Sequence, residues 1–202
     1  MKQFNYVGPA SEIVELTATQ VEGRRFYKTP DDKWYPSVTT VTSHISAPTI
    51  KAWEERVGWE KAEKIRRTSS LRGSKYHGIV ESYLKGDLQK VEKSEGLPAY
   101  LFGFARKDLD RIDNIHCIEA PLYSNDLCLA GRVDCIAEFD GELAIIDFKY
   151  WERTGCEVKK LVTLSIAEDG QTQVVQKYDK IPYIDTLCEW IKEFRYFLGS
   201  KV

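Results

Sequence analysis

The sequence lacks any apolar run long enough to cross a bilayer, and no stretch is typical of a secretion signal or an organelle-targeting peptide. Internal repeats and low-complexity segments are absent too. The five cysteines form neither a CxxC pair nor the even-numbered set typical of secreted disulfide scaffolds. We therefore expect a cytoplasmic protein with reduced thiols and no membrane partner.

A strong excess of either charge is also missing. The chain carries 29 basic and 31 acidic residues, so its formal net charge is −2. A near-neutral total does not exclude nucleic acid as a partner, because binding depends on a local basic face. With 202 residues, of which 43% are hydrophobic, the chain is long enough for one globular domain with a real core.

The most informative stretch is GRVDCIAEFDGELAIIDFK, residues 131–149. Apolar and polar residues alternate on both sides of Asp140-Gly141, a pair typical of a two-residue type I′ hairpin turn. If these two residues form the loop, Phe139 faces Glu142. Counting outward then predicts Asp134 directly opposite Asp147.

This pairing has a chemical consequence. Directly opposed residues have Cβ atoms about 4.5–5.5 Å apart, and like charges there are destabilising unless something, such as a divalent cation, offsets them. Lys149 shares a face with Asp147, since side chains two apart in a strand point the same way. An ordinary half-exposed hairpin is the alternative. Against it, Ile136, Leu143 and Ile145 make the same face apolar nearer the turn.

Asp134, followed by Asp147-Phe148-Lys149 after a hydrophobic strand, resembles the PD-(D/E)XK nuclease superfamily, with Asp147 in the (D/E) position and Lys149 in the K position. The Gly131–Asp134 segment and a histidine on an earlier helix resemble its RecB-like exonuclease branch. Further stretches are similar to phage-encoded exonucleases and the mitochondrial genome maintenance exonuclease: YPSVTTV, AWEERVG, RGSKYHGIVESYL and the final helix.

The resemblance implies a mixed α/β fold with a restriction-endonuclease-like core, in which helices flank a central mixed β-sheet. It implies one nuclease domain over residues 1–202, with an N-terminal hairpin region (1–45), a helical region (46–112), and a core sheet with a C-terminal helix (113–202). Some members of the branch hold an iron–sulfur cluster on four cysteines, which the cysteine spacing here does not support. A phage-encoded member would act in the host cytoplasm.

For the site, the resemblance implies Mg²⁺ or Mn²⁺ bound by Asp134, Asp147, His77 and the backbone carbonyl of Phe148. Hard oxygen ligands suit these ions. Lys149 would orient or deprotonate the attacking water. Asp134, Asp147 and Lys149 are therefore the expected catalytic residues.

Four further residues are candidates for contact with DNA. Arg72 is a candidate phosphate clamp, and the hydroxyls of Ser37 and Thr39 have the chemistry to hold a phosphate, although β-propensity alone also explains that stretch. Glu81 is either a second acidic group near the site or a surface partner of Lys85, four residues away.

Apolar spacing, caps and turn residues predict the remaining elements. We expect strands or extended runs at 24–29, 34–42, 115–123, 160–167 and 171–176. We expect helices at 48–68, with Pro48 in its first turn, at 75–85, with Ser74 as N-cap, at 97–112 and at 179–198. The last helix has an apolar stripe formed by Ile184, Leu187, Trp190, Ile191, Phe194 and Phe197.

The chain departs from the family pattern after Lys149. Only about ten residues precede the next strand, whereas a parallel crossover needs about a dozen or more, and Tyr150–Thr154 looks like only the last turn of a helix. Either the segment has been shortened, or the next strand pairs differently, or residues are missing from the numbered sequence.

The expected function is that of a metal-dependent DNA exonuclease acting on single strands or ends, in phage DNA replication, recombination or degradation, with phage or host replication or recombination proteins as partners. A structure-specific endonuclease of the same superfamily and a catalytically impaired DNA-binding accessory protein are the alternatives.

Overall fold

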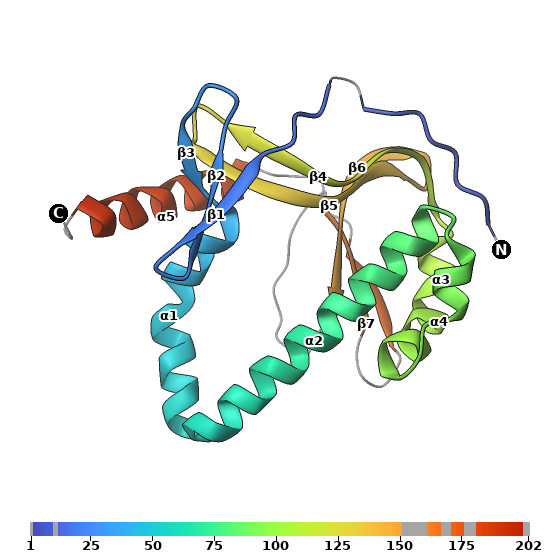
Figure 1. The fold of residues 1–202 in the computed structure, drawn as a ribbon, viewed down its shortest axis with the longest axis horizontal. Coiled ribbons are helices and arrows are strands. Elements are labelled where there is room, and N and C mark those ends of the chain that lie inside the picture. The colour runs from blue at the N-terminus through green and yellow to red at the C-terminus, as the bar shows by residue number, and fades with distance from the viewer. Residues whose placement is uncertain (1, 10–11, 151–160, 167–170, 176–180, 200–202) are drawn as a thin grey trace. The chain divides into compact units, whose positions relative to one another are not determined.

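The computed structural model describes residues 2–9, 12–150, 161–166, 171–175 and 181–199 (Figure 1). The chain divides into two compact units. The first contains Met1–Ala10, Glu63–Glu119 and Val133–Asp179, and the second contains Ser11–Ala62, Ala120–Arg132 and Lys180–Val202. No helix within the described residues is long and apolar enough to span a membrane.

The strands are β1 (Thr17–Val21), β2 (Arg24–Lys28), β3 (Trp34–Pro36), β4 (Ile112–Ser124), β5 (Leu129–Phe139), β6 (Glu142–Tyr150), β7 (Leu161–Ile166) and β8 (Thr172–Val175). The helices are α1 (Val38–Val57), α2 (Trp59–Leu84), α3 (Leu88–Glu92), α4 (Leu97–Leu109) and α5 (Ile181–Gly199). One sheet has the order β1-β2-β3 and the other β4-β5-β6-β7-β8.

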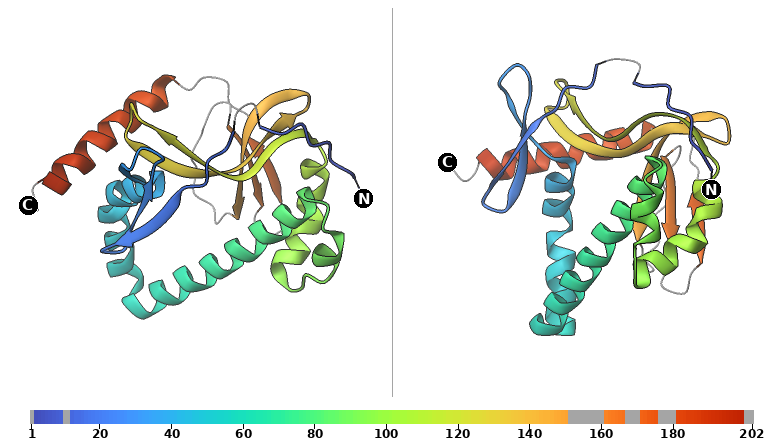
Figure 2. Two further views of the ribbon diagram at one scale, coloured as in Figure 1. Left: turned by 45° about the horizontal axis from the view of Figure 1, so that its top comes forward. Right: turned by 45° about the vertical axis from the view of Figure 1, so that its right-hand side comes forward.

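The five-stranded sheet is mixed. β5 and β6 are antiparallel, β6 and β7 are parallel, and β7 and β8 are antiparallel. In the first unit, α4 packs against β7 and β8 (Figure 2). This architecture confirms the predicted mixed α/β class and is compatible with a nuclease-like core.

The β5–β6 hairpin has the predicted register. Phe139 pairs with Glu142, and the ladder continues to Cys135 opposite Ile146. Asp140 and Gly141 have φ values of 54° and 81°, as a type I′ turn requires. Arg111 holds this turn, because its Nε donates to the Asp140 carboxylate at 3.0 Å and its guanidinium lies 4.4 Å from the Phe139 ring centre.

The core of the first unit lies between its helices and one face of the sheet. Tyr76, Val80 and Tyr83 of α2 are fully buried. They pack in one cluster with residues of α4 and of the predicted inner face of the hairpin: Leu101, Ala105, Leu109, Cys135, Ala137, Phe139, Ala144, Ile146 and Phe148. On the opposite face, Leu143 and Ile145 are 61% and 43% exposed. Leu143 and Ile145 are therefore solvated, and the prediction that they mark a covered face is wrong.

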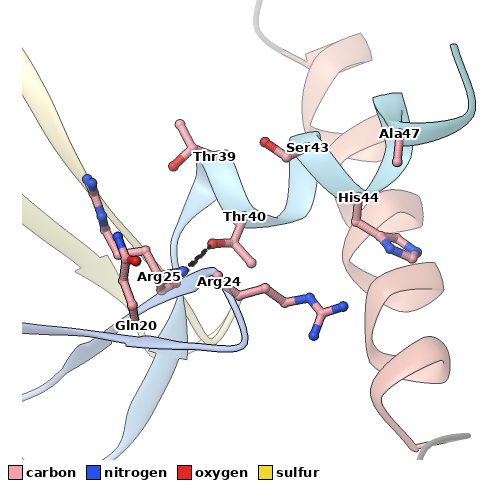
Figure 3. Close-up of a pocket in the computed structure, with 9 residues that line it drawn as sticks. Gln20, Arg24, Arg25, Thr39, Thr40, Ser43, His44 and Ala47 are labelled. Carbon is pink, nitrogen blue, oxygen red and sulfur yellow. Dashed lines mark hydrogen bonds between the residues drawn. The ribbon is translucent and has the colours of Figure 1, made fainter. Parts of the chain in front are cut away.

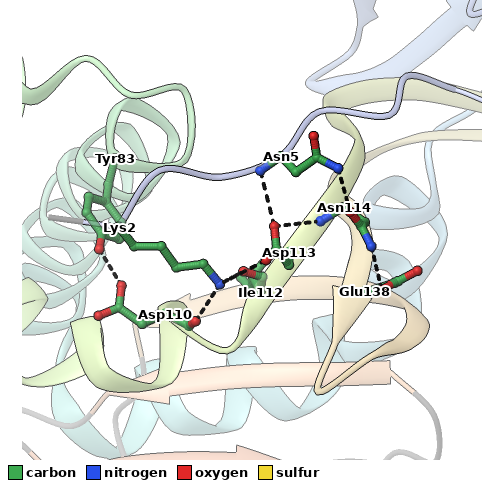
Figure 4. A network of polar contacts seen from close by, with 8 residues as sticks. All are labelled: Lys2, Asn5, Tyr83, Asp110, Ile112, Asp113, Asn114 and Glu138. Atoms are coloured by element: carbon green, nitrogen blue, oxygen red, sulfur yellow. Dashed lines mark hydrogen bonds and ion pairs between the residues drawn. The ribbon is translucent and has the colours of Figure 1, made fainter.

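The N-terminal residues are fastened to the start of β4 (Figure 4). Lys2 Nζ donates to the backbone carbonyls of Asp110 and Ile112, at 2.8 and 2.6 Å. The Asn5 amide donates to Asp113 Oδ1 at 3.1 Å, and Asn114 Nδ2 donates to Glu138 Oε2 at 2.7 Å. The first bond satisfies the carbonyl of Asp110, the C-cap of α4, and the others hold the N-terminal segment and β5 against the start of β4.

In the second unit, α5 supplies much of the core. Phe194 and Ile191 are buried against Val41 and Leu129, with Leu187, Trp190 and Phe197 packed around them. These residues confirm the predicted stripe, while the side chain of Ile184 lies outside the described residues.

Two helix starts differ from the prediction. α1 begins at Val38 rather than after an extended run to residue 42, because the Ser37 hydroxyl accepts the Thr40 amide at 3.0 Å and caps the helix. Pro48 consequently lies inside α1. α2 is continuous through Gly73 and Ser74, so Ser74 is not an N-cap. A single helical glycine costs only about 1 kcal/mol, which packing of the buried face outweighs.

The next strand along the chain after Lys149 is β7, and it pairs in parallel with β6. Ten residues, 151–160, separate Tyr150 from Leu161, fewer than the expected crossover length, yet Asp147 is in register with Thr163 and Tyr150 with Ile166. The predicted helical turn after Tyr150 lies outside the described residues, and Tyr150 itself ends β6.

Phe194→Ala should lower the free energy of unfolding by about 3–5 kcal/mol, because it removes a fully buried ring from the core. Tyr196→Ala is the matched control on the same helix, since Tyr196 is 81% exposed, and should change stability by less than about 0.5 kcal/mol. Urea unfolding of both variants measures the difference. Should Phe194→Ala fail to fold, Phe194→Leu gives the same comparison; equal effects at both positions would contradict this core.

Candidate metal centre

Three side chains with metal-binding chemistry converge in the first unit. His77 comes from α2, Glu119 from β4 and Asp134 from β5, and one ligand atom from each lies within 4.8 Å of the others. His77 Nδ1 is 3.5 Å from Asp134 Oδ2. All three residues are partly buried. Three elements far apart in the sequence thus bring one imidazole and two carboxylates together.

Glu119 reaches this cluster from an irregular position in β4. Its φ is 54°, a left-handed conformation uncommon for residues other than glycine. Burial in β4 alternates at Ile115 and Cys117, and then two consecutive residues, Ala120 and Pro121, are both buried. Such a change of phase is what a β-bulge produces when it redirects a side chain. The sequence predicts only a strand over residues 115–123 here, and Glu119 is not among the predicted metal ligands. The available signal was a single acidic residue in an apolar strand.

Asp134 is fixed by the neighbouring strand. Its Oδ2 accepts a hydrogen bond from the Phe148 amide at 2.8 Å, and the side chain is 15% exposed. In a strand, the N–H and C=O of one residue point to the same side. The Phe148 carbonyl is therefore directed toward the same edge of β6 as the bond to Asp134, which is where the predicted backbone ligand would have to lie.

The positions of Asp147 and Lys149 in β6 follow from the register of the hairpin. The paired register ends with Cys135 opposite Ile146, so Asp134 and Asp147 are the next residues of the two strands, and their direct opposition stays a prediction. Asp147 is partly buried but is not a member of the three-residue cluster. The backbone of Lys149 is in register with Ser165 of β7, and its side chain lies outside the described residues.

The residues predicted to contact DNA are distributed over both units. In the first, Arg72 lies five residues before His77 on α2, and Glu81 pairs with Lys85 at 2.6 Å, the second of the two roles left open for it. In the second, Ser37 is only 2% exposed and its hydroxyl bonds to Thr39 and Thr40. Thr39 is exposed.

The thiol of Cys135, the residue after Asp134 in β5, is not suited to bind a metal. Burial raises the pKa of Cys135 to about 12, and the nearby Cys117 and Asp134 add to the rise. A thiol with such a pKa stays protonated near neutral pH, and a protonated thiol is a poor nucleophile and metal ligand. The donor set of the centre is therefore nitrogen and carboxylate oxygen.

No protein-family model matches the chain. The chain is similar to mitochondrial genome maintenance exonuclease 1 from Xenopus tropicalis, at 29% identity over 127 residues, and from Mus musculus, at 27% over 126 residues. The Homo sapiens protein is 26% identical over 128 residues. These alignments cover 58% of this chain and 36–37% of the relatives, so the chain spans just over a third of their length. At 26–29% identity, these similarities support the expected exonuclease-like relationship.

Glu119→Gly should be more stable than Glu119→Ala by about 1 kcal/mol, because a left-handed conformation costs residues other than glycine about 1–2 kcal/mol. Glu138 is the matched control, a glutamate in β5 that is not among the positive-φ residues. There glycine should be less stable than alanine by about 0.5–1 kcal/mol. Urea unfolding in EDTA tests the four variants, and the same order at both positions would contradict the strained conformation of Glu119.

Proposed function

We propose that this protein is a divalent-metal-dependent deoxyribonuclease that degrades DNA from its ends, on single strands or at duplex termini. The observation that carries the proposal is the cluster of His77, Glu119 and Asp134, whose ligand atoms lie within 4.8 Å of one another. The similarity to proteins named exonucleases supports the same reaction class.

The donor set fits Mg²⁺ or Mn²⁺. Carboxylate and carbonyl oxygens suit these hard cations, and one imidazole is compatible with Mn²⁺ in particular. His77, Glu119, Asp134 and Asp147 would hold the ion, together with the carbonyl of Phe148. When bound, such an ion lowers the pKa of a coordinated water and polarises a phosphoryl oxygen.

The protein residues then orient the reactants. The Phe148 amide holds Asp134 in one position, so this carboxylate needs no reorganisation when substrate binds. We assign Lys149 to the attacking water, which it would orient or deprotonate, and to the negative charge that develops on the phosphate. Such a role requires the Lys149 side chain to lie on the Asp147 face of β6, as the two-residue period of a strand predicts.

Phosphate contacts would come from outside the metal centre. Arg72 on α2 is the proposed clamp in the first unit, and Thr39 is the proposed hydroxyl donor in the second. Ser37 is less suited, because it is buried and its hydroxyl already caps α1. Glu81 is better explained by its pair with Lys85. We propose that both units form one nuclease domain, in a phage DNA-processing pathway with DNA as substrate and replication or recombination proteins as partners.

An endonuclease of the same superfamily remains the second candidate, since the same metal chemistry serves both reactions. A decayed, DNA-binding accessory protein would not need an imidazole and two carboxylates held within 4.8 Å, because like charges placed together are destabilising without a cation.

Saturating Mn²⁺ should raise the melting temperature of the protein by several degrees, because a ligand at about 100 times its Kd stabilises the native state by about 2.7 kcal/mol. Asp134→Asn should abolish the shift. Glu138→Gln is the control, an isosteric change on the same strand that keeps an acceptor for Asn114. Thermal unfolding of each protein with Mn²⁺ and with EDTA measures the shift in melting temperature. An undiminished shift in Asp134→Asn would place the ion elsewhere.

Asp147→Asn and Lys149→Ala should each lower DNA cleavage by about 100-fold or more, as removal of a group that acts in the transition state typically does. Glu138→Gln should cleave normally. End-labelled linear single-stranded DNA and a circular single strand of the same sequence are digested with Mg²⁺, Mn²⁺ or EDTA. Degradation of the linear form alone is expected. Cleavage of the circle would favour the endonuclease, and full activity of either variant would contradict the mechanism.

A further inference from the structure

Helix α4 presents two aromatic rings to solvent. Tyr100 is 63% exposed and Phe104 is 41% exposed, and their ring centres lie 5.0 Å apart in an edge-to-face arrangement. Other large apolar residues of the same helix, Leu101, Phe102 and Leu109, are buried in the core of the first unit. Aromatic side chains are enriched in protein interfaces. The exposed pair is therefore a candidate for contact with a partner.

One face of α4 combines these rings with a glycine and a cation. Residues three and four apart are neighbours on a helix surface, and all four residues of this face are exposed. Arg106 is a further exposed cation beside it, and residues 96–107 include no acidic residue. We call this surface the aromatic face, and it consists of Tyr100, Gly103, Phe104 and Lys107.

The described neighbours of Gly103 do not require a glycine. It lies in the interior of α4 and is not among the glycines with a positive φ. A Cβ at this position would meet nothing within 4 Å. A glycine inside a helix is less stable than alanine, but it lets another backbone or a ligand approach closely. Gly103 thus leaves room for a partner between the rings and Lys107.

The aromatic face is directed away from the candidate metal centre. The opposite side of α4 packs against β7 and β8 (Figure 1), where Leu101, Ala105 and Leu109 share one buried cluster with the hairpin. The ligands of the centre come from α2, β4 and β5. α4 itself therefore separates this face from a substrate bound at the centre, and a partner other than the substrate explains the face better.

We propose that the aromatic face docks an acidic peptide segment of a partner protein, one that carries an aromatic or large aliphatic side chain. This side chain packs on Tyr100 and Phe104, and the peptide backbone passes close to Gly103. Carboxylates of the peptide pair with Lys107 and Arg106. The two positive charges outweigh the charge of about −0.5 at the C-terminal end of a helix, so the face attracts an anionic segment. The proposal does not depend on the nuclease activity.

Fluorescence anisotropy with the full chain in EDTA tests the proposal. The probe is a labelled peptide of four glutamates and two phenylalanines, and the comparison probe has alanine in place of phenylalanine. Only the first peptide should bind. Tyr100→Ala should weaken its binding by about 10-fold or more, as the loss of an aromatic anchor does. A labelled single-stranded 12-mer in the same assay represents DNA.

Gly103→Ala separates docking from stability. Alanine is the better helix former, so this variant should raise the melting temperature by about 2–4 °C. Its methyl group should nevertheless weaken peptide binding by about 10-fold, because it fills the space that the peptide backbone needs. Gly73→Ala is the matched control, a glycine inside α2 with equally open surroundings. It should raise the melting temperature similarly and leave peptide binding unchanged.

Arg25→Gln tests whether positive charge alone is enough. Arg25 is an exposed cation of the second unit, beside a polar cavity of about 550 Å³. Arg24 also lines this cavity, but Figure 3 shows the two side chains pointing to opposite sides of β2, as consecutive residues of a strand do. The two guanidinium groups therefore do not converge, and Arg25→Gln should bind the peptide like the unchanged protein.

The proposal is overturned if the phenylalanine peptide does not bind, if the alanine peptide binds equally, or if Tyr100→Ala and Arg25→Gln have equal effects. A loss of 12-mer affinity in Tyr100→Ala would assign the face to DNA and overturn it as well. Asp134→Asn distinguishes it from the nuclease proposal, since this variant should lose the Mn²⁺ thermal shift yet bind the peptide normally.

Discussion

The hydrogen bond from the Phe148 amide to Asp134 is the contact on which the candidate centre depends. It joins β5 to β6 just past the last paired residues of the hairpin, Cys135 and Ile146, so the position of the carboxylate is set by the register. A slip of one residue would turn every side chain of the hairpin to the opposite face. Asp134 would then point into the core, and Cys135 would take its place beside His77. The type I′ turn at Asp140-Gly141 makes this slip unfavourable.

The centre is built at a cost that the other face of the sheet offsets. Glu119 holds a left-handed conformation, and residues in such conformations cost about 1–3 kcal/mol each. Two carboxylates close together add repulsion until a cation neutralises them. The same hairpin contributes Cys135, Ala137, Ile146 and Phe148 to the buried cluster beneath. Stability therefore comes from one face of β5 and β6 and chemistry from the other.

The features that the sequence predicted correctly are those set by local rules. An Asp-Gly turn and a two-residue period determine the hairpin, and a helical period determines the core face of α5. Tertiary packing explains the error in α2, since it carries the helix through Gly73 and leaves Ser74 inside it. The error at the start of α1 was local, because the N-cap at Ser37 was not predicted. Glu119 was missed for another reason. Whether a glutamate takes a positive φ depends on the strands around it. In the sequence alone, Glu119 looks like one polar residue in the ordinary alternation of a strand.

The near-zero net charge gives no measure of the charge at the metal centre. A centre that holds a divalent cation requires carboxylates, and the cluster brings Glu119 and Asp134 together with His77. The formal total of −2 sums over the whole chain, whereas at physiological ionic strength exposed charges more than about 8 Å apart are largely screened from each other. The field at the centre is therefore set by the few charges beside it, and a nearly neutral chain is compatible with binding a cation there.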